Sequence, residues 1–152
     1  MKKDAIEKLF WSIALPGFGQ LLNGKYIKGI LLITLELLVN VQSNFNEVIL
    51  LSFHGEIEAA IVKVEYQWLM FYPCLYFFAA WDAYKDARGT QSNYSFFPFV
   101  FAAYTVTVGL IYSSSIKIFG WILGPVFFPI LCVIPGVLIG LIVQKTLKLL
   151  TK

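Results

Sequence analysis

The feature that most limits the possible folds is a long apolar stretch near the carboxyl terminus, residues 118–143, which contains no charged side chain. As a helix it exceeds the length of about 20 residues that crosses the hydrocarbon core of a bilayer. The whole chain is 14% charged and 59% hydrophobic, whereas a soluble domain is typically about a quarter charged. Because a chain of 152 residues cannot bury so much apolar surface in water, we expect an all-α integral membrane protein.

Four apolar stretches predict four transmembrane helices, at residues 26–41, 66–81, 96–112 and 118–143. Pro73 predicts a kink in the second helix, and Gly89 predicts the end of that helix. The fourth stretch is longer than one straight crossing requires and contains several prolines and glycines. We expect a bent helix there, or two half-helices.

A short N-terminal helix and a glycine-rich turn precede the first crossing. The apolar stretch 9–15 is too short to span a membrane, so it predicts an interfacial or re-entrant helix. The proline and glycines of the turn end this helix and permit close packing. Its two amide side chains can bond the backbone groups that the turn leaves free. The candidate residues of this turn are Pro16, Gly17, Gly19, Gln20, Asn23 and Gly24.

Residues 42–65 interrupt the apolar pattern with polar side chains. Their apolar residues recur every three or four positions, which is typical of an amphipathic helix. We expect this helix to be broken or bent near Gly55 and to lie on the extracytoplasmic side. The chain then forms one integral membrane domain, residues 1–152, with an interfacial segment and turn (1–25), a first helical hairpin with a polar outer loop (26–88), and a second helical hairpin (96–152).

The distribution of positive charge predicts the orientation. With four crossings and a cytoplasmic amino terminus, two of the 12 basic residues lie outside, Lys63 and Lys117, which leaves ten inside. The positive-inside rule favours this arrangement, since an odd number of crossings would place one basic cluster outside. We therefore expect a plasma-membrane protein with both termini cytoplasmic.

One carboxylate lies within the first apolar stretch. Glu36 and Asn40 are four residues apart, so they share a helix face. Because a charge at this depth is costly, Glu36 should face protein or water, be paired, or be protonated. It could belong to a proton, cation or ligand site, or serve as an interhelical hydrogen-bond anchor. We favour the anchor, because no second buried charge is evident near it in the sequence.

Three short motifs and one helix end stand out: Pro16-Gly17-Phe18-Gly19-Gln20, Asn23-Gly24-Lys25-Tyr26, Lys28-Gly29-Ile30 and Trp81-Asp82-Ala83-Tyr84. Over residues 12–88 they resemble the two-transmembrane-helix (TM-two) domain family, which includes many small bacterial membrane proteins. The chain differs from that family in having Gln20 where a histidine is common, a polar insertion between the crossings, and a further helical hairpin. The family is known by its shape rather than by a reaction, so the resemblance implies a fold and no activity.

The sequence contains no recognisable catalytic motif, metal-ligand spacing, cofactor-binding loop or nucleic-acid footprint. We expect a non-enzymatic protein without a cofactor that binds the bilayer and a membrane-protein partner, or itself, as a scaffold or accessory subunit. The turn would act as a hinge, and Asp82 and Asp86 would form a cytoplasmic contact surface. Asp82 could also pair with Lys85, three residues along the helix.

Two other classes of function remain open from the sequence. In the first, the chain is part of a channel or transporter, and Glu36 and Asn40 face a cavity. In the second, it is a lipid-modifying enzyme that uses His54 with Asp82 and Asp86. The predicted topology opposes the enzyme, since it places His54 outside and the aspartates inside.

Overall fold

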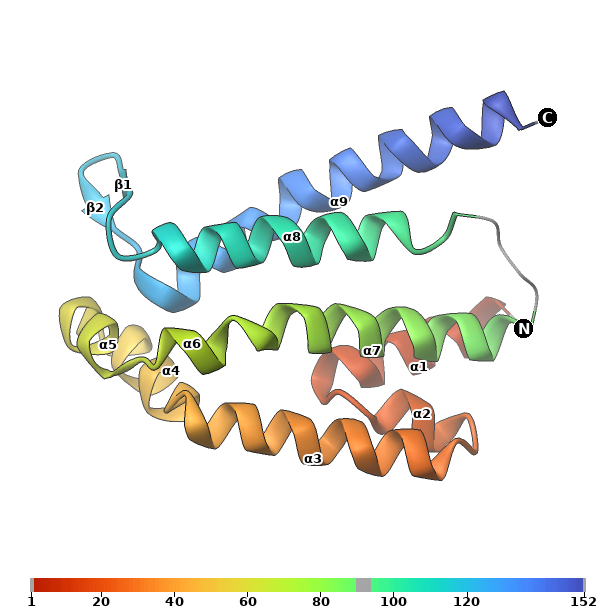
Figure 1. Cartoon of the computed structure of the whole chain (residues 1–152), viewed down its shortest axis with the longest axis horizontal. Helices are drawn as coiled ribbons and strands as arrows, with labels where there is room; N and C mark the ends of the chain where they lie inside the picture. Colours follow the sequence, from red (N-terminus) through yellow and green to blue (C-terminus); the bar gives the residue numbers. More distant parts are fainter. Residues whose placement is uncertain (1, 90–93, 152) are drawn as a thin grey trace.

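The computed structural model describes residues 2–89 and 94–151 and shows an all-α fold with one small β-hairpin (Figure 1). Four long helices lie side by side, and the start of α1 and the end of α9 lie at the same end of the molecule (Figure 1). The long helices are α3 (Tyr26–Gln42), α7 (Phe71–Arg88), α8 (Phe97–Tyr112) and α9 (Gly124–Leu150).

One helix of the described ranges, α9, is by itself long and apolar enough to cross a membrane. Helices α3 and α4 (Phe45–Phe53) meet the same criterion only as a pair, and this pair is bent by 63°. The all-α prediction is confirmed, but length and composition do not support four transmembrane helices. The physical reason is that α3 and α8 have 17 and 16 residues, fewer than the usual 20 or so. Helix α7 carries charged residues near its C-terminal end.

The N-terminal residues form a helical hairpin of α1 (Lys2–Ala14) and the short α2 (Phe18–Leu22). Helix α1 lies lengthwise along α7, and the chain then turns back towards the end of the molecule where it began (Figure 1). The hydroxyl of Tyr76 on α7 donates a hydrogen bond to the Ile13 carbonyl near the end of α1. Helices α1 and α2 thus form a hairpin on α7, and whether this hairpin is interfacial or re-entrant stays a prediction.

The turn between α1 and α2 is buried, and its conformation requires glycine. Gly17 has a φ of +106°, which side-chain-bearing residues rarely adopt. A Cβ atom there would lie 2.5 Å from the Gly29 carbonyl oxygen and 2.7 Å from Cγ1 of Ile33. The glycine therefore allows the turn to pack closely against the backbone of α3, as the sequence predicted for the glycines of the turn.

The second predicted crossing is two helices, α6 (Tyr66–Leu69) and α7. The break falls at Met70, just before Pro73, which lies in the first turn of α7. A proline inside a continuous helix would clash with the carbonyl four residues earlier, which here belongs to Leu69. Helix α7 continues past residue 81, where the predicted crossing ends, and stops at Gly89. The φ of +63° at Gly89 confirms the predicted helix stop.

The amphipathic segment forms two helices, α4 and α5 (Ile57–Lys63). They are separated at Gly55, whose φ is +83°, so the predicted break is confirmed. Both helices pack against α9. The buried hydrophobic cluster of the described residues lies here, and it includes Val48, Ala60, Leu69, Leu110 and Val126.

The fourth predicted crossing begins too early. Residues 118–122 belong to a β-hairpin of β1 (Lys117–Ile118) and β2 (Trp121–Ile122), and α9 begins only at Gly124. The prediction of two half-helices is also wrong, because α9 continues through Pro129 and Pro135. The adjacent helix also bonds the backbone of α9 three residues before Pro135: the Thr105 hydroxyl of α8 donates to the Cys132 carbonyl at 2.7 Å.

Small residues let α8 and α9 approach closely. A Cβ atom on Gly136 of α9 would lie 2.7 Å from the Ala102 Cα and 2.7 Å from the Phe101 carbonyl oxygen. Both of these atoms belong to the backbone of α8, so they cannot move away as a flexible side chain would. The close approach of α8 and α9 thus depends on the absence of a side chain at this position.

We expect Gly136→Val to destabilise the protein by about 1–3 kcal/mol, because the added side chain pushes the two backbones apart. The free energy of unfolding is measured by denaturation in mild detergent, followed by circular dichroism. Leu138→Ala is the control, since that side chain is 55% exposed and does not separate α8 from α9. Equal stability of Gly136→Val and the wild type would contradict the packing described here.

Candidate functional site

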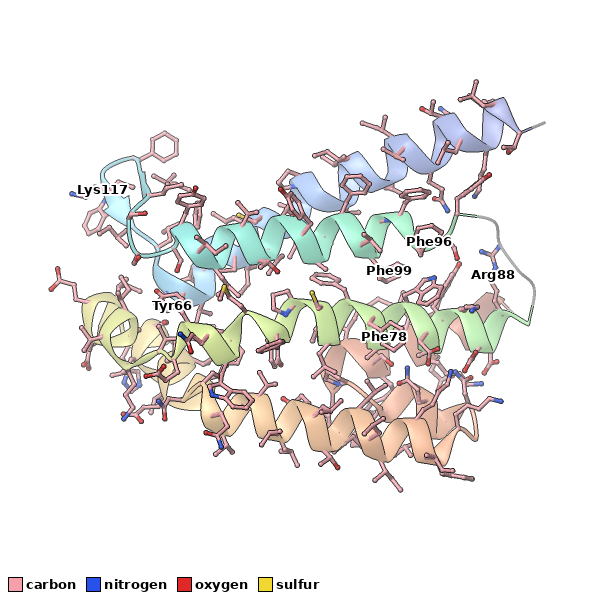
Figure 2. The ribbon with its side chains drawn as sticks, in the orientation of Figure 1. Tyr66, Phe78, Arg88, Phe96, Phe99 and Lys117 are labelled. Atoms are coloured by element: carbon pink, nitrogen blue, oxygen red, sulfur yellow. The ribbon has the colours of Figure 1, made fainter. Side chains whose placement is uncertain are left out.

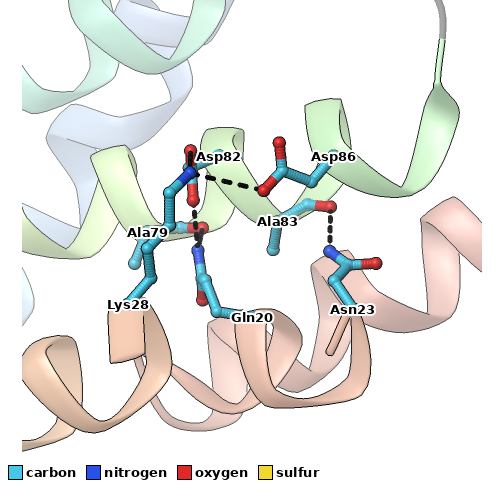
Figure 3. A network of polar contacts seen from close by, with 7 residues as sticks. All are labelled: Gln20, Asn23, Lys28, Ala79, Asp82, Ala83 and Asp86. Carbon is cyan, nitrogen blue, oxygen red and sulfur yellow. Dashed lines mark hydrogen bonds and ion pairs between the residues drawn. The ribbon is translucent and has the colours of Figure 1, made fainter. Parts of the chain in front are cut away.

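A polar network connects α2 and the start of α3 to the C-terminal half of α7 (Figure 3). Gln20 is fully buried, and its Nε2 donates to the Ala79 carbonyl at 2.8 Å and to Oδ2 of Asp82 at 3.1 Å. Nζ of Lys28 lies 2.8 Å from Oδ1 of Asp82 and 3.4 Å from Oδ2 of Asp86. The two oxygens of the Asp82 carboxylate are therefore both bonded, one by an amide and one by an ammonium group.

Helical periodicity brings these groups together. Gln20 on α2 and Asn23, the C-cap residue of α2, are three residues apart. Their amides reach two carbonyls four residues apart on α7, those of Ala79 and Ala83. Asn23 donates to the Ala83 carbonyl through Nδ2 at 2.8 Å. Asp82 and Asp86 are likewise four residues apart, so both carboxylates face Lys28 (Figure 3).

Glycines make this approach of α2 to α7 possible. A Cβ atom on Gly19 would lie 2.6 Å from the Cβ of Ala83 and 2.5 Å from the Lys8 carbonyl oxygen. Gly24 is favoured for a different reason. A Cβ atom there would meet no other atom within 4 Å, but its φ of +71° favours glycine. Pro16, in the turn before α2, is fully buried. The candidate glycines and proline thus place the amides of α2 against α7.

The contribution of each charged group in the network to stability depends on how deeply it is buried. The side chain of Asp82 is 7% exposed, whereas that of Lys28 is 50% exposed. A buried carboxylate without partners is costly, so its two bonds are needed to keep it in place. The half-exposed ammonium group contributes less, because water screens it. The arrangement is best described as a brace that fixes α2 and α3 on α7, and we call these residues (Gln20, Asn23, Lys28, Asp82 and Asp86) the α7 brace.

The sequence identified most members of the brace but assigned them to two separate features, a hinge and a contact surface. It missed Lys28, although the position of that lysine just inside the first apolar stretch was an available signal. The suggested partner of Asp82 was Lys85. In the structure Asp82 pairs with Lys28, while Nζ of Lys85 lies 4.8 Å from the centre of the Trp81 ring.

Glu36 and Asn40 lie outside the brace. Glu36 is 5% exposed, and its side chain contacts Asn40 and the Tyr72 hydroxyl of α7. Nδ2 of Asn40 donates to Oδ1 of Asn46, on α4, at 3.2 Å. Glu36 thus faces protein, as expected for a carboxylate in an apolar helix, and its contact with Tyr72 favours the interhelical anchor.

His54 is not brought near the two aspartates. It caps the C-terminal end of α4, at the end of the molecule opposite to that where α7 ends (Figure 1). Within the part of the chain that the structure describes, no three His, Cys, Asp or Glu side chains gather where they could hold a metal ion.

A groove between α7 and α8 is a second candidate site, which the sequence did not reveal. It has a volume of about 540 Å³ and an almost wholly apolar lining. Figure 2 shows Phe78 of α7 with Phe96 and Phe99 between the two helices. At one end of the groove Nε1 of Trp81 donates to Oγ of Ser95 at 3.4 Å. Outside the groove, the hydroxyls of Tyr66 and Ser113 are 3.2 Å apart.

The chain matches no protein-family model, and comparisons with curated proteins and with solved structures give no significant match. The resemblance to the TM-two family therefore stays a prediction. What can be inferred about function rests on the α7 brace, the groove and the exposed surface.

The α7 brace can be tested with the two neighbouring lysines. We expect Lys28→Met to lower the free energy of unfolding by about 1–3 kcal/mol, because it leaves the Asp82 carboxylate with one of its two partners. Lys25→Met is the matched control, since Lys25 is exposed, and it should change stability by less than about 0.5 kcal/mol. Unfolding in mild detergent measures both.

The double variant Lys28→Met/Asp82→Leu tests whether Lys28 and Asp82 stabilise the fold as a pair or independently of each other. If the pair acts as a unit, the loss in the double variant is smaller than the sum of the two single losses. Strictly additive losses would show that Lys28 and Asp82 do not depend on each other.

Proposed function

We propose that this chain is a non-enzymatic, multi-pass membrane protein that acts as an accessory subunit, and that it binds a transmembrane helix of a partner in the groove between α7 and α8. The groove is the observation that carries this proposal. In this arrangement α3, α7, α8 and α9 cross the membrane, both termini are cytoplasmic, and α1 with α2 forms a re-entrant hairpin.

Exposed apolar side chains support the membrane location. On α3, Ile27 is 87% exposed, Ile30 is 62% exposed and Val41 is 69% exposed. On α9, Ile134 and Ile142 are 61% and 66% exposed. Contiguous apolar surface of this extent is unfavourable in water and favourable in a bilayer. The proposed orientation agrees with the excess of Lys and Arg on the side where α1 begins.

The shape and composition of the groove support a helix as its occupant. The groove follows α7 from Cys74 to Trp81 and α8 from Phe96 to Thr107, so it extends along the helix axes for roughly 10–16 Å at 1.5 Å per residue. Its lining includes Ala103 and Thr107, which are four residues apart on α8. Small residues at this spacing let a second helix approach closely.

Aromatic side chains line the groove, and several remain accessible. Phe78 is 50% exposed, Tyr104 is 67% exposed, and the nearby Val100 is 54% exposed. Large rings that are available at an interface commonly supply much of its binding free energy. A partner helix would cover these side chains, whereas the α7 brace keeps α7 in position from another face of the helix.

The test is affinity purification from native membranes in mild detergent, followed by mass spectrometry, on matched variants. We expect Val100→Trp, which fills the groove, to reduce recovery of a stoichiometric membrane partner at least about tenfold, equivalent to about 1.4 kcal/mol of binding. Ile139→Trp on α9 is the control, because that side chain is 42% exposed and does not line the groove. It should leave recovery unchanged.

Each of two outcomes would contradict one part of the proposal. Recovery of the same partner with both variants would show that the partner binds outside the groove. The other outcome is self-association alone, with a proton or solute flux in reconstituted vesicles that Glu36→Gln abolishes. The second result would support a channel, with Glu36 as a functional group and not only a hydrogen-bond anchor.

The topology makes a separate prediction. Single cysteines introduced at His54 and Lys85, after replacement of Cys74 and Cys132 by alanine, should react with a membrane-impermeant thiol reagent from opposite sides. We expect position 54 to react in intact cells and position 85 only after the membrane is permeabilised. Reaction of both positions from one side would exclude the proposed four crossings.

A further inference from the structure

The β-hairpin between α8 and α9 presents two aromatic rings to the outside. Phe119 is 98% exposed, and Trp121 is 76% exposed. In this hairpin Lys117 pairs with Ile122 and Ile118 pairs with Trp121, so residues 119 and 120 form its two-residue turn. Neither ring contributes to the buried hydrophobic cluster.

The backbone conformation of this turn is unusual for a phenylalanine. Phe119 has a φ of +50°, and Gly120 has a φ of +88°. Two-residue turns with positive φ at both positions favour Asn-Gly, because bulky side chains strain this conformation. At 98% exposure, the Phe119 ring has almost no contact within the described chain to compensate for that strain. Such a strained and exposed residue points to a contact outside the chain.

The location of the hairpin indicates what that contact is. The hairpin lies at the end of the molecule opposite to the start of α1 and the end of α9 (Figure 1). The apolar surface continues from α8 into the hairpin through Tyr112 and Ile116, which are 50% and 40% exposed. The Phe119 and Trp121 rings therefore extend the apolar surface at the end of α8, one of the helices proposed to cross the membrane.

Charged side chains lie next to the hairpin, where they indicate the boundary between lipid and water. Lys117, labelled in Figure 2, belongs to β1, next to the turn. A cavity of about 610 Å³ between the hairpin and α5 is lined by Glu56, Glu58 and Lys117, and also by Trp121. Aromatic rings beside a lysine, between an apolar surface and a charged cavity, are typical of the interface between a membrane and water.

We propose that the rings of Phe119 and Trp121 insert into the lipid headgroup layer on the extracytoplasmic side, with Lys117 next to the lipid phosphates. The hairpin then anchors the α8–α9 pair at this surface. This inference rests on the proposed membrane crossing of α8 and α9.

Spin labels measure the insertion directly. The full chain, with Cys74 and Cys132 replaced by alanine, receives one cysteine by Phe119→Cys, Glu58→Cys or Ile134→Cys. Each variant is labelled and reconstituted in vesicles of phosphatidylcholine and phosphatidylglycerol. Collision rates with oxygen, which concentrates in lipid, and with a water-soluble nickel complex give the depth of the label. We expect position 119 to be intermediate between Ile134, in the lipid, and Glu58, in water.

The controls distinguish the possible failures. If position 134 is as accessible to nickel as position 58, α9 is not in the membrane and the proposed function fails as well. If position 134 is protected but position 119 behaves like position 58, the hairpin is in water and the anchoring proposal alone is wrong. Protection of position 119 from both oxygen and nickel would show that a protein covers it, which also contradicts the proposal.

A second variant separates the effect of the Phe119 ring from the effect of the turn conformation. Phe119→Asn suits the positive φ at this position, so the hairpin should be retained. We expect a label introduced by Trp121→Cys to become at least about twice as accessible to nickel when Phe119→Asn is added. Unchanged accessibility would show that the Phe119 ring does not hold the hairpin in the lipid.

Discussion

The burial of the Asp82 carboxylate is the constraint on which the first half of the structure depends. At 7% side-chain exposure this group requires partners, and α7 alone does not supply them in the structure. They come from Gln20 and Lys28, more than fifty residues away in the sequence. The amide of Gln20 reaches Asp82 because α2 lies against α7, and α2 can do so because Gly19 has no side chain. The glycine-rich turn and the buried aspartate therefore depend on each other. The carboxylate needs the partners that the turn brings to it, and the packing of α2 on α7 is stabilised by the bonds to the carboxylate.

The two halves of the chain are stabilised by different means. In the first half, polar side chains hold α2 and α3 on α7, and glycines provide the space. In the second half, α8 and α9 approach through Gly136 and Gly140, and the Thr105 hydroxyl bonds the Cys132 carbonyl. In the proposed bilayer location the hydrophobic effect would not drive these helices together, so hydrogen bonds and close packing of small residues would take over that role. The groove lies where these two well-packed halves meet, and its aromatic lining is correspondingly accessible.

The features that the sequence predicted correctly depend on local conformation. Gly55 and Gly89 interrupt or end helices because of their own φ preferences, and Pro73 breaks the second crossing through a clash with its own chain. The β-hairpin was missed because residues 118–122 are as apolar as the helix that follows, and Phe119-Gly120 is not a typical turn pair. The pairing of Lys28 with Asp82 could not be predicted from spacing, since it depends on how α2, α3 and α7 pack. The groove was missed for the same reason, because it exists only between two helices that are separate in the sequence.

Helix α7 connects the α7 brace to the proposed function. With about 100° of rotation per residue, Cys74, Phe78 and Trp81 share one face of α7, Ala79, Ala83 and Asp86 lie on another, and Asp82 lies between the two. The brace thus bonds one face of the helix and leaves the other free to line the groove with α8. Because the brace contacts α7 at both carboxylates and at two backbone carbonyls, it fixes the rotation of the helix about its own axis as well as its position. A partner helix would then meet a groove whose aromatic side chains are already oriented, which lowers the entropic cost of binding. Internally bonded polar groups on one face and accessible aromatic side chains on another therefore support the proposal of a helix-binding subunit.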